Sequence, residues 1–129
     1  MLALDYGSAR TGVAVSDPTG TLARPLGVVE NAASEAGLAR LVELVETEHA
    51  DRVVVGMPLT LRGERGEQAR ATEVFVEALA ARLDVPVETY DERFTTGLAQ
   101  RTPSAAPEDA RAAAHLLTSY LEWSSSARA

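Results

Sequence analysis

The chain has no cysteine, and none of its basic residues is a lysine. Without cysteine, disulfide bonds and thiolate metal sites are excluded. All 12 basic residues are arginines, whose planar side chain suits two-point hydrogen bonding to phosphate. The formal net charge of −7 argues against a general nucleic-acid coat protein, because such domains are usually basic. Contacts to nucleic acid would therefore depend on where individual arginines lie.

Long hydrophobic runs are also missing. No stretch approaches the roughly 20 apolar residues that cross a membrane as a helix. The N-terminus has neither the basic segment nor the cleavage site of a signal peptide, so we expect a cytoplasmic protein with no membrane partner. The length of 129 residues predicts one domain over residues 1–123, followed by a flexible C-terminal tail at 124–129.

The first part of the chain predicts three short strands and a helix. The strands lie at 2–5, 11–16 and about 21–29, with glycine-containing turns between them. Pro25 indicates that the third strand lies at an edge of the sheet or contains a bulge. Apolar residues then recur at helical spacing from about 32 to 49.

The second part predicts alternating strands and helices. The run 52–56 is continuously apolar and β-branched, which is typical of a strand buried on both faces. We expect a helix at 67–83, a strand at 85–90, a brief helix near 95, and a last helix from 107 to about 123. Together these elements predict an α/β fold, in which one mixed five-stranded sheet carries helices on both faces.

Acidic residues stand where strand ends and a helix start would meet. Asp5 closes the first strand, Asp91 and Glu92 close the last strand, and Asp109 opens the final helix. A carboxylate held against a sheet core is costly unless it is paired or binds a cation, so Asp5 is the hardest to explain structurally. Asp91 and Glu92 stay equal candidates at this point, because neighbouring strand residues point to opposite faces.

The position of Asp109 has two explanations. It shares a helical stripe with Ala112, Ala113, Leu116 and Tyr120, which predicts that it faces the sheet. It could equally be a favourable charge near the positive end of the helix dipole. Oxygen ligands without histidine or cysteine suit Mg²⁺ or Mn²⁺. Such a cluster would hold two ions for phosphodiester hydrolysis, with Asp5 bridging them from a central strand.

Four blocks in order resemble the YqgF/RuvX family of Holliday-junction-resolvase-like nucleases, and they span nearly the whole chain. The blocks are Leu4-Asp5-Tyr6-Gly7 with Arg10 and Gly12-Val13-Ala14-Val15-Ser16-Asp17; Val55-Gly56-Met57-Pro58-Leu59 with Gly63, Gly66, Gln68 and Ala69; Asp91-Glu92-Arg93-Phe94-Thr95-Thr96; and Asp109-x-x-Ala112-Ala113-x-x-Leu116-Leu117.

The resemblance implies an RNase H-like three-layer α/β/α fold, divalent-metal dependence, and a role in maturing the 5′ end of precursor 16S ribosomal RNA. It implies Asp5, Glu92 and Asp109 as the catalytic and metal-binding residues, and so prefers Glu92 over Asp91. The chain departs from the family in two places. Ala9 replaces a usual lysine and Thr60 a usual asparagine, and neither change removes an acidic residue.

Four arginines are candidates for binding substrate phosphates. Arg10 and Arg93 stand beside motif residues, whereas Arg62 and Arg65 belong to a glycine-flanked segment. Ordinary surface charge is the alternative explanation, and for Arg65 the two explanations are nearly equal.

Several functions fit these patterns. The first is a metal-dependent nuclease acting on structured RNA, with branched DNA as the alternative substrate. A non-catalytic RNA-binding assembly factor is a further reading. Aspartate-glycine turns also occur in actin-like ATPases and sugar kinases, but those close two domains over a nucleotide, whereas we expect one domain here. Both a monomer and a homodimer are consistent with the sequence. A resolvase that cuts two strands symmetrically favours the dimer.

Overall fold

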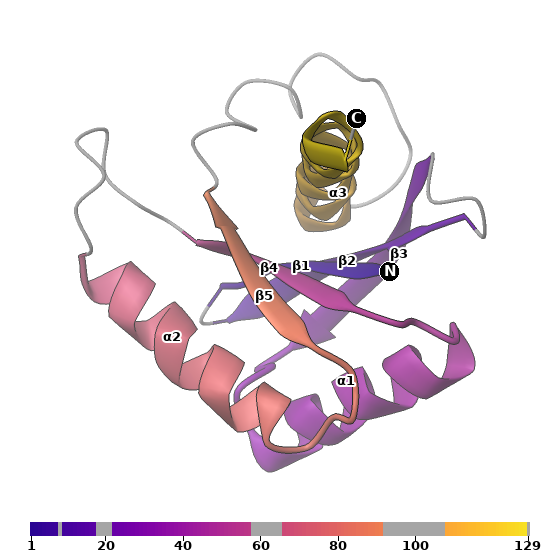
Figure 1. Ribbon diagram of the computed structural model, residues 1–129. Coiled ribbons are helices and arrows are strands. Elements are labelled where there is room, and N and C mark those ends of the chain that lie inside the picture. The colour runs from indigo at the N-terminus through magenta and orange to yellow at the C-terminus, as the bar shows by residue number, and fades with distance from the viewer. Residues whose placement is uncertain (8, 18–21, 58–65, 92–107, 129) are drawn as a thin grey trace.

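The computed structural model describes residues 1–7, 9–17, 22–57, 66–91 and 108–128 (Figure 1). Side chains are described for these residues except at positions 91, 108, 109 and 123–128. The elements in chain order are β1 (Leu2–Asp5), β2 (Arg10–Ser16), β3 (Ala23–Glu30), α1 (Glu35–Thr47), β4 (Val53–Met57), α2 (Glu67–Ala80), β5 (Val87–Asp91) and α3 (Glu108–Arg128).

The strands form one mixed sheet in the order β3-β2-β1-β4-β5. β1 is central; it pairs antiparallel with β2 and parallel with β4, which in turn pairs parallel with β5. Helices α1 and α2 lie on one face of the sheet and α3 lies on the other (Figure 1). The predicted three-layer α/β/α arrangement with a five-stranded sheet is confirmed.

Proline explains the irregular edge of the sheet. β3 is an edge strand, as Pro25 indicated. Its register against β2 shifts, because Val13 pairs with Gly27 whereas the next residue, Ala14, pairs with Pro25. Leu26 is thus the extra residue of a bulge, a place where a strand tolerates a proline that cannot donate a hydrogen bond.

The two faces of the sheet have different cores. Leucine, valine and phenylalanine fill the face under α1 and α2, where Phe75 of α2 is fully buried among them. The face under α3 is built largely from alanines, including Ala3, Ala14 and Ala113, with Leu117. Small side chains on both partners let α3 approach the sheet closely.

The start of α1 is fixed by a cap and a glycine. Ser34 caps the helix, because its Oγ accepts a hydrogen bond of 3.1 Å from the backbone N–H of Gly37. A Cβ at Gly37 would overlap the backbone carbonyl oxygen of Asn31 and would lie 2.6 Å from Cα of Ala32. Only glycine therefore fits where this helix crosses the preceding turn.

Some expected boundaries are wrong. The last helix was expected to end at about 123, with a flexible tail after it, but α3 continues to Arg128. The segment 124–128 contains serine and alanine but no glycine or proline that would stop a helix. The buried stripe of α3 is also wider than expected. It includes Ala110, Ala113 and Leu117, whereas Ala112 is only half-buried.

One further expectation, the brief helix near 95, lies outside the described residues. Across the described ranges, none of the helices is both long enough and apolar enough to cross a membrane.

Candidate metal and nucleic-acid site

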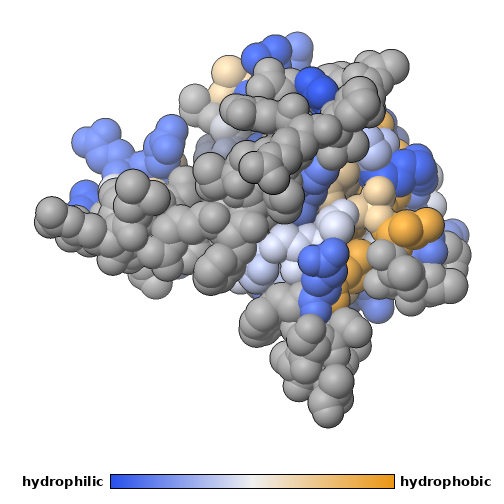
Figure 2. Space-filling model, turned by 90° about the horizontal axis from the view of Figure 1, so that it is seen from above, coloured by the Kyte–Doolittle hydropathy of each residue, from blue (hydrophilic) through white to orange (hydrophobic). Residues whose placement is uncertain are grey.

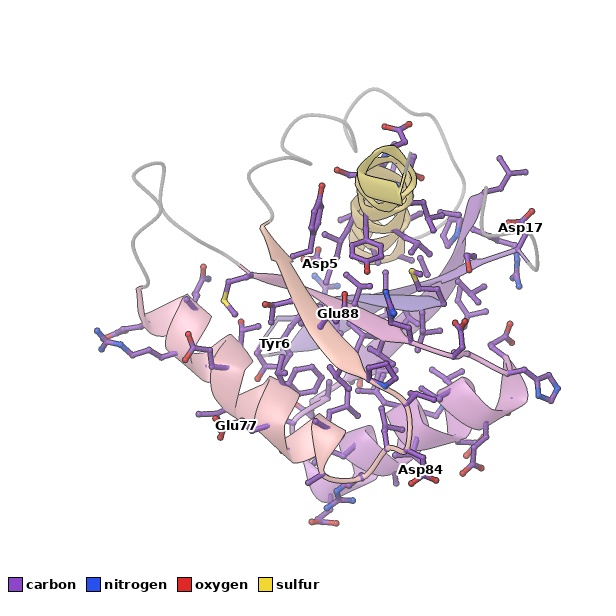
Figure 3. All side chains as sticks on the ribbon, in the orientation of Figure 1. Asp5, Tyr6, Asp17, Glu77, Asp84 and Glu88 are labelled. Carbon is purple, nitrogen blue, oxygen red and sulfur yellow. The ribbon has the colours of Figure 1, made fainter. Side chains whose placement is uncertain are left out.

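Asp5 lies at the end of the central strand, on the face that α3 covers. Along β1, Leu2 and Leu4 pack with the core under α1 and α2, whereas Ala3 packs with the core under α3. Because side chains alternate along a strand, Asp5 follows Ala3 onto the α3 face. Figure 3 shows Asp5 on the α3 side of the sheet and Tyr6 on the opposite side, toward α2. The side chain of Asp5 is half-buried.

Glycines occupy the neighbouring strands at the level of Asp5. In the antiparallel pair, Asp5 lies opposite Gly12 of β2. In the parallel pair, Leu4 lies beside Val55, so the next position on β4 beside Asp5 is Gly56. Any side chain at these two positions would begin about 5 Å from Cβ of Asp5. Neither position adds a side chain beside the carboxylate, and both glycines are themselves buried.

The turn after Asp5 is held on both sides. The ring of Tyr6 stacks on Phe75, with 4.3 Å between ring centroids and 17° between planes. The backbone N–H of Gly7 donates to Oγ1 of Thr11, and this hydroxyl donates to the carbonyl oxygen of Gly7, both at 3.4 Å. A Cβ at Gly7 would overlap the carbonyl oxygen of Arg10. These contacts fix the direction in which the chain leaves β1.

β5 continues the row that contains Asp5. Gly56 pairs with Tyr90, so Tyr90 is level with Asp5 two strands away, at about 10 Å for a strand spacing of about 4.8 Å. Glu88 and Tyr90 form their side-chain contacts with α3, so they lie on the α3 face. β5 therefore ends at Asp91, one position beyond the level of Asp5.

The C-terminal half of α3 lies at the N-terminal ends of the parallel strands. Tyr120 contacts Arg52, which directly precedes β4, and both Leu121 and Met1 pack against the core under α3. Figure 1 shows α3 nearly end-on where β4 and β5 are seen lengthwise, so the helix crosses the sheet. Position 109 lies in the first turn of α3.

Arg52, Tyr120 and Glu88 form a hydrogen-bonded network at the other end of α3. Nη1 of Arg52 donates to the Tyr120 hydroxyl at 2.9 Å, and that hydroxyl donates to Oε2 of Glu88 at 2.7 Å. Nη1 of Arg52 also lies 3.4 Å from Oε1 of Glu88. Burial, followed by the hydrogen bond to Glu88, raises the pKa of Tyr120. Nothing in the sequence predicted this network, because Arg52 and Glu88 look like ordinary surface residues.

The predicted site residues divide into three groups. Asp5 is described in full, and Arg10, the exposed first residue of β2, lies opposite Glu30. Asp91 and Asp109 are placed by their backbones only, at the end of β5 and in the first turn of α3. The remaining candidates lie outside the described residues: Glu92, Arg93, Arg62 and Arg65. The described residues alone include no group of three metal-binding side chains.

The donor set and its surroundings fit Mg²⁺ or Mn²⁺. Asp5 carries carboxylate oxygens, the ligand type that these ions prefer, and the two neighbouring glycines place no side chain beside it. Among the residues coloured in Figure 2, hydrophilic ones outnumber the hydrophobic ones on the face that is shown. Asp17, by contrast, has a structural role, because its Oδ1 accepts from the N–H of Leu22 at 3.0 Å.

Comparison with known proteins decides the family. Residues 1–123 match the RuvX family model, which is described as Holliday junction resolvase. The chain belongs to the RuvX family. RuvX is a family of nucleases, and the resemblance expected from the sequence is confirmed.

Relatives and solved structures agree with this assignment. A Chloroflexus aurantiacus protein named "Putative pre-16S rRNA nuclease" is 45% identical over 101 residues, 78% of this RuvX chain and 66% of the relative. A Desulforudis audaxviator protein of the same name is 36% identical, with 99% of this chain and 97% of the relative covered. Thermus thermophilus RuvC in complex with a Holliday junction has a TM-score of 0.60 at 19% identity, covering 96% of each chain. This likeness confirms the RNase H-like fold.

Proposed function

We propose that this RuvX chain is a divalent-metal-dependent nuclease that hydrolyses phosphodiester bonds of structured RNA, in 5′-end processing of precursor 16S ribosomal RNA in the cytoplasm. One observation carries the proposal. A carboxylate, Asp5, stands on the central strand with glycines on both neighbouring strands at its level. A carboxylate on a central strand, next to two positions without side chains, offers the oxygen ligands that Mg²⁺ and Mn²⁺ prefer.

Asp5, Glu92 and Asp109 are the proposed metal ligands. In the chain, Glu92 directly follows β5, and Asp109 is the second residue of α3. The choice of Glu92 over Asp91 follows from the resemblance to the family.

When bound, two Mg²⁺ or Mn²⁺ ions would supply a hydroxide nucleophile and stabilise the leaving oxygen. The protein supplies the rest. Asp5 is held by a rigid central strand and by the fixed turn that follows it, so its carboxylate stays at one position. Such fixed placement matters because catalysis is sensitive to displacements of about 1 Å.

Arginines complete the proposed nucleic-acid surface. Arg10 is exposed at the start of β2, at the same end of the sheet as Asp5. Arg93 follows the proposed ligand Glu92, and Arg62 and Arg65 follow β4 in the chain. Guanidinium groups near a metal site can hold the phosphates on either side of the cleaved bond. This placement lets an acidic protein bind an acidic substrate locally.

A branched-DNA substrate is the second candidate, because the matching family model is described as Holliday junction resolvase. The test compares end-labelled precursor 16S RNA and a four-way DNA junction, each with Mn²⁺, Mg²⁺ or EDTA. We expect metal-dependent cleavage of the RNA that is lost in Asp5→Asn. Cleavage of the junction alone, together with a dimer in solution, would replace the RNA proposal with the resolvase function. Binding without cleavage would leave the assembly-factor function.

A further inference from the structure

We infer that Tyr120 and Tyr90 are positioning residues, which hold α3 and β5 in the relative placement that the metal site needs. The inference rests on the proposed function, since it assumes that Glu92 follows β5 as a ligand and that Asp109 in α3 is another. It assigns a role to two buried or half-buried tyrosines that are not among the proposed ligands.

The backbone contacts of α3 do not fix it to β5. α3 packs mainly across β1, β2 and β3, which lie on the other side of the sheet's centre. β5 is an edge strand, supported on one side only, by β4. An edge strand and a helix that scarcely meet could shift relative to each other by the small distances that disturb a metal site.

Long side chains bridge this gap at two points. The Tyr120 hydroxyl donates to Glu88 of β5 at 2.7 Å, and the Tyr90 hydroxyl of β5 lies 2.9 Å from Oγ of Ser119 in α3. The rings of Tyr90 and Tyr120 meet edge to face, with centroids 5.6 Å apart. Figure 3 shows Glu88 on the sheet face beneath α3.

Tyr120 makes its hydrogen bonds from a buried position, which makes them costly to break. Tyr120 is only 2% exposed, so its hydroxyl cannot exchange Glu88 for water without exposing the ring. Arg52 donates to the same hydroxyl, which joins β4 to the network as well. β4, β5 and α3 are thereby tied together.

The test measures Mn²⁺ affinity by the paramagnetic resonance signal of free Mn²⁺, at a temperature where circular dichroism shows every variant folded. We expect Tyr120→Phe and Tyr90→Phe each to weaken Mn²⁺ binding about tenfold, as loss of residues that orient metal ligands does. Thr118→Val is the matched control. Thr118 donates within α3, to the carbonyl oxygen of Ala114, so its loss leaves the bridge to β5 intact.

Substrate kinetics give a second readout. Because the tyrosines act on ligand placement and not on substrate contacts, both variants should lower kcat while KM stays near the wild-type value. If both variants melt at a lower temperature but bind Mn²⁺ within twofold of wild type, the tyrosines only stabilise the fold and the inference is overturned. If wild type and Asp5→Asn bind Mn²⁺ equally, the proposed metal site itself is wrong and the inference fails with it.

Discussion

Replacing Gly56 with alanine should remove activity without harming the fold. The change adds one methyl group on the α3 face, level with Asp5 on the adjacent strand. That methyl would lie about 5 Å from Cβ of Asp5. Mg²⁺ binds carboxylate oxygen at about 2.1 Å and keeps several waters. The methyl therefore occupies space that an ion or its waters need.

The magnitude follows from the displacement. An ion forced to move by about 1 Å from the position set by Asp5 should cost about 100-fold in kcat. The lower conformational entropy lost by alanine than by glycine in a strand should raise the free energy of unfolding by about 0.5–1 kcal/mol. Gly56 is buried, so the methyl also meets neighbouring atoms, which offsets this gain in stability. Gly12→Ala is a poorer test, because α3 packs on β2 and the added methyl would also disturb that packing.

The assay is metal-dependent cleavage of precursor RNA, run beside thermal unfolding. Gly27→Ala is the control: it lies in a strand of the same sheet, and an added Cβ there meets no atom within 4 Å. We expect Gly27→Ala to cleave like wild type and Gly56→Ala to cleave about 100-fold more slowly at an unchanged or higher Tm. Wild-type cleavage by Gly56→Ala would refute the idea that the glycine makes room for an ion.

Other predictions concern stability. Gly37→Ala should lower the free energy of unfolding by about 2–3 kcal/mol, because the new methyl overlaps backbone atoms of the preceding turn that cannot move aside; an unchanged urea midpoint would contradict this. The pKa of Tyr120 is raised above 10.0 by burial, so the folded state holds this proton more tightly than the unfolded chain. Wild type should therefore lose Tm more steeply than Tyr120→Phe as the pH rises from 10 upward, and parallel curves would disprove the linkage.

The sequence was sufficient to predict the sheet because each strand carried a distinct signal. The continuous run at 52–56 predicted a strand buried on both faces, and β4 is buried at every position. Pro25 predicted an edge or a bulge, and β3 has both. Boundaries were less predictable, since α3 lacks a stop signal and continues to Arg128.

For the site, the position of a residue along the chain was informative, whereas the register between neighbouring strands could not be predicted. Asp5 stood out because a lone carboxylate at the end of an apolar strand has few structural explanations. The role of Gly56 could not be predicted, since it depends on the register of β4 against β1, which arises from tertiary packing. The same holds for Glu88 and Tyr120, whose contact joins residues 32 positions apart.

The central claim is that Asp5 holds a catalytic metal, and thermal unfolding of wild type and Asp5→Asn with and without Mn²⁺ tests it most directly. An ion that binds only the folded state at about 100 times its Kd adds about 2.7 kcal/mol of stability. For a domain of this size that raises Tm by about 10 °C. We expect this rise in wild type and its loss in Asp5→Asn. An equal rise in both proteins would contradict the account, because the metal would then bind without Asp5.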